Sequence, residues 1–141
     1  MADLGRDNIN AKNHNYGSTS VLAVDDEYDI VNLIKQSLQV NGNKVCAYTD
    51  ANIALDHFNS DPKDRHDIVI SDIRMPGMNG YEFVRKVKEI DPKVKVILMS
   101  AFEINVKEFH NLLPDIKVDA FLQKPFSLQQ LHDMVLKIKA D

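Results

Sequence analysis

The sequence contains no apolar run long enough to cross a bilayer and no apolar signal-peptide core near its start. A membrane-spanning helix needs about 20 predominantly apolar residues, and a signal peptide needs a shorter apolar run close to the N-terminus. We therefore expect a cytoplasmic protein that makes no contact with a membrane.

Cysteine is almost absent as well. Cys46 is the single cysteine in 141 residues, so an internal disulfide is excluded. It stands between Val45 and Ala47, where we expect a small buried thiol and not a redox centre. The five histidines are scattered along the chain, and none falls at metal-ligand spacing with the cysteine or with an acidic cluster. The sequence therefore does not indicate a site for histidine-bound metal.

An excess of positive charge is also lacking. With 17 Lys and Arg against 21 Asp and Glu, the net charge is −4, which gives no reason to expect direct nucleic-acid binding. Apolar residues make up 44% of the chain and charged residues 27%, as in a single globular domain. Residues 1–18 are poor in large apolar side chains, so they predict a flexible tail before one domain over residues 19–141.

Short apolar runs rich in β-branched residues alternate with longer segments of helical periodicity. This alternation predicts an α/β fold, in which helices cover both faces of a parallel sheet. Right-handed crossovers favour the strand order 2-1-3-4-5, the flavodoxin-like doubly wound (βα)5 arrangement. The expected strands are residues 20–24, 44–48, 67–71, 94–99 and 118–122.

Apolar residues recur at spacings of three and four in the intervals between those runs, which is the pattern of amphipathic helices. The apolar stripe of the first helix includes Leu33, and that of the second includes Ile53. Asp50 is placed to cap the second helix. A weaker helix is expected over residues 104–113, where Pro114 cuts it short.

Polar side chains follow four of the five expected strands. Asp25 and Asp26 follow the first, Asp72 the third, Ser100 the fourth, and Lys124 lies close to the end of the fifth. The carboxyl ends of parallel strands share one edge of the sheet, where ligands bind in open α/β folds. Three crowded carboxylates repel one another unless a cation joins them, and all-oxygen ligation suits Mg²⁺, with Mn²⁺ as a substitute.

The same set of residues suits a phosphoryl group, with which Mg²⁺ usually shares its site. Lys124 offers a positive charge to phosphate oxygens, while the Ser100 hydroxyl and the Ala101 N–H can donate hydrogen bonds. Asp72 can then act as a nucleophile and form an aspartyl-phosphate. Each residue alone is more often a turn, a cap or a solvated charge, so the joint pattern carries this prediction.

Four motifs in this order resemble the receiver domain of two-component response regulators, over about residues 19–139. The resemblance implies that Asp72 accepts a phosphoryl group from the phosphohistidine of a sensor histidine kinase or of a histidine phosphotransfer protein. It also implies no other enzymatic activity than the domain's own phosphorylation and dephosphorylation. The motifs are Val-Asp25-Asp26-Glu-Tyr-Asp-Ile, Ser-Asp72-Ile-Arg-Met-Pro76-Gly-Met-Asn-Gly80, Met-Ser100-Ala101 and Phe121-Leu-Gln-Lys124-Pro125-Phe.

The resemblance implies individual roles around the metal. Asp26 and Asp72 would hold Mg²⁺ together with the backbone carbonyl of Arg74, and Asp25 would orient a metal-bound water. Phe102 and Arg74 occupy variable positions beside the site, and we expect their bulk to hinder the hydrolytic water and prolong the phosphorylated state.

It further implies a coupled switch pair, Ser100 and Phe121, and a cis peptide bond before Pro125. Two features depart from the family pattern: Lys117-Val118 stand where it usually has Gly-Ala, and Pro114 interrupts the approach to the last strand. No output domain follows in this sequence, so we expect the signal to pass to a separate protein, unless the chain is part of a longer one. A phosphorylation-dependent homodimer is a further expectation.

Three other classes stay open on the residues alone. A Mg²⁺-dependent phosphohydrolase with an Asp nucleophile would place two acids two residues apart after the first strand, and Asp25-Asp26-Glu27 lacks that spacing. A flavin-binding module of the same fold would need hydroxyls and glycines in this acidic loop. A pseudo-receiver that binds partners without phosphate usually lacks one acid or the lysine, and none is lost here.

Overall fold

The computed structural model describes residues 19–60, 65–103 and 105–140, so the expected tail over residues 1–18 lies outside the described part. Five parallel strands form one sheet in the order β2-β1-β3-β4-β5. This order confirms the predicted flavodoxin-like arrangement. The strands are β1 (Ser20–Val24), β2 (Lys44–Tyr48), β3 (Ile68–Asp72), β4 (Lys95–Ser100) and β5 (Ala120–Gln123).

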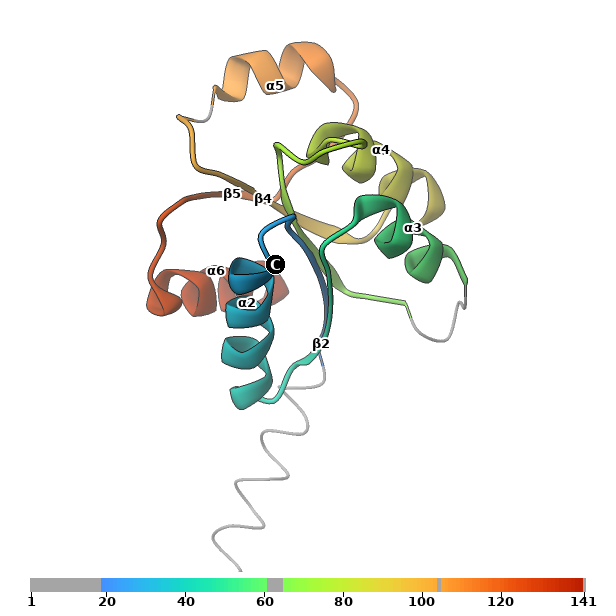
Figure 1. Ribbon diagram of the computed structural model, residues 1–141. Coiled ribbons are helices and arrows are strands. Elements are labelled where there is room, and N and C mark those ends of the chain that lie inside the picture. Colours follow the sequence, from blue (N-terminus) through green and yellow to red (C-terminus); the bar gives the residue numbers. More distant parts are fainter. Residues whose placement is uncertain (1–18, 61–64, 104, 141) are drawn as a thin grey trace, which may run out of the picture.

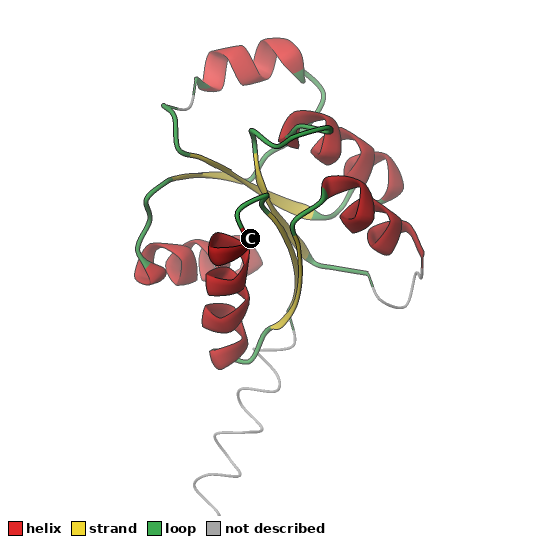
Figure 2. Ribbon diagram, viewed as in Figure 1, coloured by secondary structure: helices red, strands yellow, loops and turns green. Residues whose placement is uncertain are grey.

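Helices cover the sheet on both faces (Figures 1 and 2). One face is covered by α2 (Tyr28–Val40) and α6 (Leu128–Ala140). The other is covered by α3 (Ala51–Ser60), α4 (Gly80–Ile90) and α5 (Val106–Leu112). Helices α2, α3, α4 and α5 each join two parallel strands by a crossover, and α6 follows β5. This arrangement leaves the carboxyl ends of the strands free to form a site.

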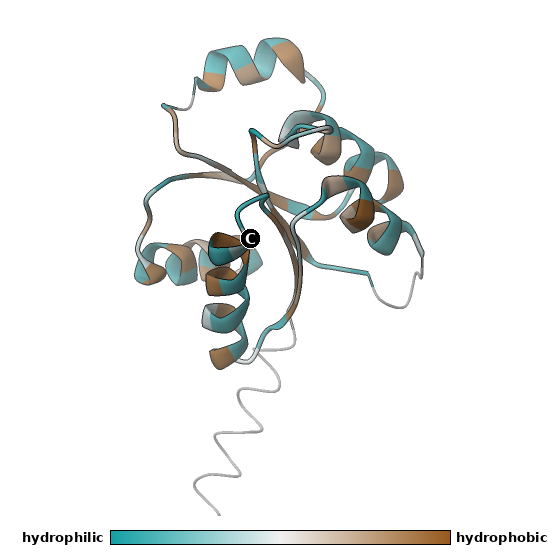
Figure 3. Ribbon diagram, in the orientation of Figure 1, coloured by the Kyte–Doolittle hydropathy of each residue, from teal (hydrophilic) through white to brown (hydrophobic). Residues whose placement is uncertain are grey.

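Two apolar cores lie on opposite sides of the sheet, because successive strand residues point to opposite faces. In β1, Val21 and Ala23 face α2 and α6, whereas Leu22 and Val24 face α3 and α4. Figure 3 shows the helices with hydrophobic residues on one side and hydrophilic residues on the other. Apolar packing on both faces of the sheet thus holds in place the strands that the polar site residues follow.

The helix boundaries follow local signals. The Asp50 carboxylate accepts a hydrogen bond from the Asn52 N–H at 2.8 Å, so it caps α3 as predicted. The Asn79 side chain accepts a hydrogen bond from the Glu82 N–H at 2.9 Å and caps α4. Helix α5 is short and ends before Pro114, as expected.

Some residues of the predicted apolar helix stripes are exposed and do not face the core. Leu33 is 41% exposed and Ile53 is 55% exposed. The buried side of α2 is formed by Val31, Ile34 and Leu38. Consecutive helix residues are about 100° apart, so the docking angle on the sheet decides which residue of a broad apolar stripe is covered.

The structure also bears on membrane insertion. In the part of the chain that it describes, no helix combines the length and the apolar character that a bilayer crossing requires.

Candidate functional site

The predicted site residues converge at one edge of the sheet. Asp25 follows β1, Asp72 is the last residue of β3, Ser100 is the last residue of β4, and Lys124 follows β5. Strands β1 and β3 are neighbours in the sheet, as are β4 and β5. The parallel topology therefore brings together polar groups that are far apart in the sequence.

Three carboxylates form the centre of this site. Asp25, Asp26 and Asp72 each offer one oxygen, and these oxygens lie within 4.8 Å of one another. Asp25 is completely buried and Asp72 is 6% exposed, whereas Asp26 faces solvent. An all-oxygen donor set of this kind fits a hard divalent cation that keeps part of its hydration shell.

The Lys124 amine lies close to acids from two strand ends, those of β1 and β3. Its Nζ lies 2.5 Å from Asp25 Oδ2, 3.5 Å from Asp72 Oδ1 and 3.7 Å from Glu27 Oε1. The Lys124 side chain is 9% exposed, so its charge is poorly screened by water. No role was expected for Glu27 from the sequence, although it stands in the acidic loop after β1.

Burial and neighbouring charge change the ionisation of these groups. Burial and the adjacent Asp25 carboxylate raise the pKa of Asp72 to about 6, although Lys124 acts in the opposite direction. Burial likewise raises the pKa of Asp25, against the lowering effect of its hydrogen bond to Lys124. Burial lowers the pKa of Lys124, but its carboxylate neighbours together raise it above the ordinary value. Lys124 therefore stays charged at neutral pH. The negative charge of Asp25 makes ionisation of Asp72 less favourable.

The raised pKa of Asp72 makes stability depend on pH when no divalent cation is present. An acid whose pKa is higher in the folded state stabilises the fold below its unfolded pKa, and this contribution is lost as the pH rises through the folded pKa. For Asp72 that window runs from the ordinary value of 3.8 to about 6. With EDTA present, Asp72→Asn should be more stable than the wild type by about 2 kcal/mol near neutral pH.

Chemical denaturation of both proteins at about pH 4 and about pH 7.5 measures this difference. Near pH 4 the two free energies of unfolding should agree, since the Asp72 carboxyl is then largely neutral in the folded protein. A wild type that is the more stable protein near pH 7.5 would show that Lys124 outweighs burial at this carboxylate.

Ser100 and Phe121 lie on neighbouring strands beside the acids. Ser100 is 5% exposed, and its Oγ accepts a hydrogen bond from the Phe102 N–H at 3.0 Å. Phe121 is half-buried and packs its edge against the ring of Phe109, with the centroids 5.4 Å apart. The Ser100 hydroxyl is thus hydrogen-bonded within its own loop, and the Phe121 ring packs against Phe109 of α5. The peptide bond between Lys124 and Pro125 is cis.

The loop after Asp72 is held by a close approach of two backbones. Gly77 has a φ of +76°, which L side chains rarely adopt. At Gly80 a Cβ atom would lie 2.2 Å from the carbonyl oxygen of Asp72. The Gly80 N–H donates to the carbonyl of Ile73 at 2.8 Å. Glycine at position 80 is therefore required for α4 to begin directly against the Asp72 backbone.

Arg74 and Phe102 flank the site from two different loops. The Arg74 guanidinium carbon lies 4.1 Å from the centroid of the Phe102 ring. This distance is within the range of a cation–π contact. The contact joins the loop after β3 to the loop after β4.

The family described as response regulator receiver domain matches residues 21–136 of this sequence. The chain belongs to this family. The receiver domain is 30% identical over 118 residues to sporulation initiation phosphotransferase F of Bacillus subtilis, and the match covers 83% of this chain and 90% of that protein. It is 36% identical over 124 residues to the C4-dicarboxylate transport transcriptional regulatory protein DctD of Pseudomonas aeruginosa, but covers only 24% of that protein.

Solved structures agree with this assignment. The chemotaxis response regulator CheY4 of Vibrio cholerae matches the receiver domain with a TM-score of 0.75 and 27% identity. The match covers 86% of this chain and 98% of that chain. The predicted family and fold class are both confirmed, and the chain is a response regulator receiver domain of two-component systems.

The histidines are scattered in the sequence, but two of them meet in the fold. The Nε2 atoms of His57 and His66 lie 3.1 Å apart, and Cys46 belongs to the same cluster. His66 is buried, whereas Cys46 is only partly buried. Sequence spacing missed this group because a strand, a helix and a loop contribute one residue each. Their contact depends on how α3 lies on the sheet.

Proposed function

We propose that Asp72 of this receiver domain accepts a phosphoryl group from the phosphohistidine of a sensor histidine kinase or a histidine phosphotransfer protein. The observation that carries the proposal is the meeting of three carboxylates with the buried amine of Lys124 around Asp72. The acids supply cation ligands, and the lysine supplies a charge for the phosphoryl oxygens. The transfer is expected to depend on Mg²⁺ or on Mn²⁺ in its place.

In this transfer a carboxylate oxygen of Asp72 attacks phosphorus, and the bond from phosphorus to the donor imidazole breaks. The imidazole nitrogen keeps the electron pair of that bond and takes up a proton. When bound, Mg²⁺ would supply positive charge that offsets the charge on the phosphoryl oxygens. Asp26, Asp72 and the carbonyl of Arg74 would hold it, while Asp25 would orient one of its waters.

The residues around Asp72 have separate tasks once the phosphoryl group arrives. Lys124 shifts from its closest partner, Asp25, to a phosphoryl oxygen. The Ala101 N–H and the Ser100 hydroxyl donate hydrogen bonds to the other oxygens. Before a cation binds, the pKa of Asp72 is raised to about 6, so this carboxylate is more basic than an ordinary one but still ionised at neutral pH. That combination favours a nucleophile.

Phosphorylation of Asp72 would also change the conformation of the switch pair, Ser100 and Phe121. The Ser100 Oγ leaves the neighbourhood of the Phe102 N–H to reach the phosphoryl group. Movement of Ser100 frees space toward which the ring of Phe121 can turn, away from its edge contact with Phe109 on α5. Phosphorylation thereby shifts a two-state equilibrium of the α5 surface. A separate output protein, or a second copy of the domain, would read this surface.

The direct test uses a small phosphodonor. Incubation of the purified domain with acetyl phosphate and Mg²⁺ should increase its intact mass by one phosphoryl group, and EDTA should prevent the increase. Sustained turnover of an external phosphate ester would instead favour a phosphohydrolase. Absence of any covalent adduct, together with tight binding of a partner, would favour a phosphorylation-independent interaction module.

The contact between Arg74 and Phe102 leads to a prediction about phosphoryl lifetime. We expect Arg74→Asn to shorten the half-life of the phosphorylated domain several-fold, because water then gains access to the phosphoryl group from the side that the pair covers. The decay is measured by intact mass after removal of the donor. Arg85→Asn, at an exposed position of α4, is the charge-matched control. An unchanged half-life in the Arg74 variant would contradict the shielding role.

A further inference from the structure

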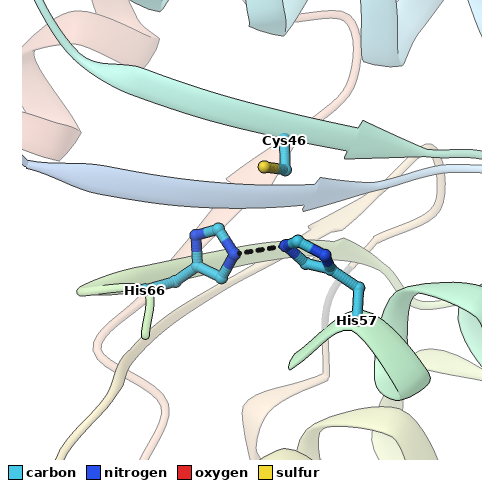
Figure 4. A group of neighbouring side chains, drawn as sticks. All are labelled: Cys46, His57 and His66. Carbon is cyan, nitrogen blue, oxygen red and sulfur yellow. Dashed lines mark hydrogen bonds between the residues drawn. The ribbon is translucent and has the colours of Figure 1, made fainter. Parts of the chain in front are cut away.

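A second group of potential metal ligands lies on the face of the sheet that α3 covers. Cys46 belongs to β2, His57 to the last turn of α3, and His66 to the segment that leads into β3. The cysteine sulfur and one ring nitrogen from each histidine all lie within 4.8 Å of one another. Figure 4 shows the two imidazoles with nitrogens turned toward each other, and Cys46 nearby.

We propose that Cys46, His57 and His66 form a binding site for a divalent transition metal of the zinc class. Zinc binds imidazole nitrogen at about 2.0 to 2.1 Å and thiolate sulfur at about 2.3 Å, so its tetrahedral ligand atoms are about 3.3 to 3.7 Å apart. The Nε2 atoms of His57 and His66 are already 3.1 Å apart. The Cys46 sulfur lies within 4.8 Å of one ring nitrogen of each histidine. We therefore expect side-chain rotations to bring all three ligands to one ion.

The chemistry of this group separates it from the acidic site. Thiolate and imidazole favour zinc and related metals, whereas carboxylates and carbonyls favour magnesium. The two groups also lie at different levels of the sheet. Cys46 pairs with Leu22 in the middle of β1, and His66 precedes β3, whereas Asp25 and Asp72 lie at the carboxyl ends of these strands. The domain would thus bind two different metals at two separate sites, and the type of ligand at each site would select the metal.

Neighbouring residues hold the imidazoles in position. The Ser20 Oγ lies 2.9 Å from His66 Nδ1, which leaves the Nε2 of that ring directed at His57. The ring of Phe58 stacks on His66 at 6.2 Å, and that of Tyr48 lies 5.3 Å from His57. A hydrogen bond to the remote nitrogen of a ligand histidine is the usual way in which proteins fix its orientation toward a metal.

The simpler interpretation is a hydrogen bond between two neutral imidazoles. That bond places one proton between the Nε2 atoms, at the position from which a metal would displace it. It gives no role to the Cys46 sulfur, which nonetheless lies within 4.8 Å of one ring nitrogen of each histidine. The cysteine therefore distinguishes the two interpretations.

A bound metal would link α3 to β2 and to the segment before β3. Its ligands come from β2, α3 and the segment before β3, which leaves the fourth tetrahedral position to water or an added ligand. Because the assembled site exists only in the folded protein, metal binding should raise the melting temperature. The increase should occur with saturating Mg²⁺ already present, since the acidic site is then occupied.

Cobalt titration of the tag-free chain tests this proposal. Co²⁺ bound by one thiolate and two imidazoles should give tetrahedral visible bands and a near-ultraviolet thiolate-to-cobalt charge-transfer band. Both should saturate at one equivalent in excess Mg²⁺ and disappear when Zn²⁺ is added. Cys46 is the single cysteine of the sequence, so the charge-transfer band reports this residue alone. A wild-type chain without that band overturns the proposal, whatever the variants do.

Variants then assign the ligands. Cys46→Ser should abolish the charge-transfer band, and His57→Gln should weaken Co²⁺ binding by about 10-fold or more. His110→Gln, at an exposed position of α5, is the histidine-matched control and should bind as the wild type does. Asp72→Asn should also keep the band, which separates this site from the acidic one. Wild-type affinity in the His57 variant, or an unchanged melting temperature with saturating Zn²⁺, would count decisively against the site.

Discussion

Asp72→Asn is expected to abolish phosphorylation by acetyl phosphate completely. The amide oxygen of Asn is a far weaker nucleophile than a carboxylate, and the substitution also removes one of the three acids that would hold the cation. Intact mass measured in Mg²⁺ should show no phosphoryl adduct at any time. Beryllofluoride with Mg²⁺ should shift the amide NMR signals of the wild type and leave those of the variant unchanged.

Asp133→Asn provides a matched control for this experiment. Asp133 is an exposed residue of α6, and its carboxylate accepts a hydrogen bond from Gln129 on the same helix. This control should be phosphorylated at the wild-type rate. Urea denaturation in the same Mg²⁺ buffer should show that Asp72→Asn is folded, so that its loss of phosphorylation does not come from unfolding. An adduct that persists in Asp72→Asn would place the phosphoryl group elsewhere and refute the assignment.

Gly80→Ala is expected to destabilise the domain by roughly 2 to 3 kcal/mol. The new Cβ would lie 2.2 Å from the carbonyl oxygen of Asp72 and 2.8 Å from the Cα of Ile73. Both are backbone atoms, so neither can rotate away, and α4 must move from the end of β3. Because the Asp72 backbone moves with it, phosphorylation should also become slower. Urea denaturation measures the first effect, and the rate of adduct formation measures the second.

Gly77→Ala separates crowding from loss of backbone freedom. Gly77 has a φ of +76°, but a Cβ at this position would meet nothing within 4 Å. The cost should therefore be limited to the strain of a left-handed conformation, about 1 kcal/mol. Equal losses of stability in the two variants would show that conformational freedom, and not the close approach to Asp72, explains glycine at position 80.

Much of the candidate site could be predicted because the relevant signals are local. The apolar run before Asp72 and the run before Ser100 each read as a buried strand. A parallel sheet then requires their carboxyl ends to meet at one edge. The chemistry of the gathered residues, with acids, a hydroxyl and an amine, follows from their identities alone. The family resemblance added roles for Arg74 and Phe121 that spacing could not supply.

Residue spacing could not predict the contacts that depend on docking. The buried side of α2 includes Val31 and excludes Leu33, because the angle at which the helix meets the sheet selects part of its apolar stripe. The approach of Gly80 to the Asp72 carbonyl is likewise a distance between two elements.

The sequence by itself determined the fold class, the strand order and the set of groups around Asp72, since periodicity and strand ends are properties of consecutive residues. Only the tertiary structure brought Lys124 to 2.5 Å from Asp25 and placed Cys46 beside His57 and His66. These contacts join residues that are distant in the chain. The packing of helices against the sheet sets such distances, and no local pattern of residues encodes them.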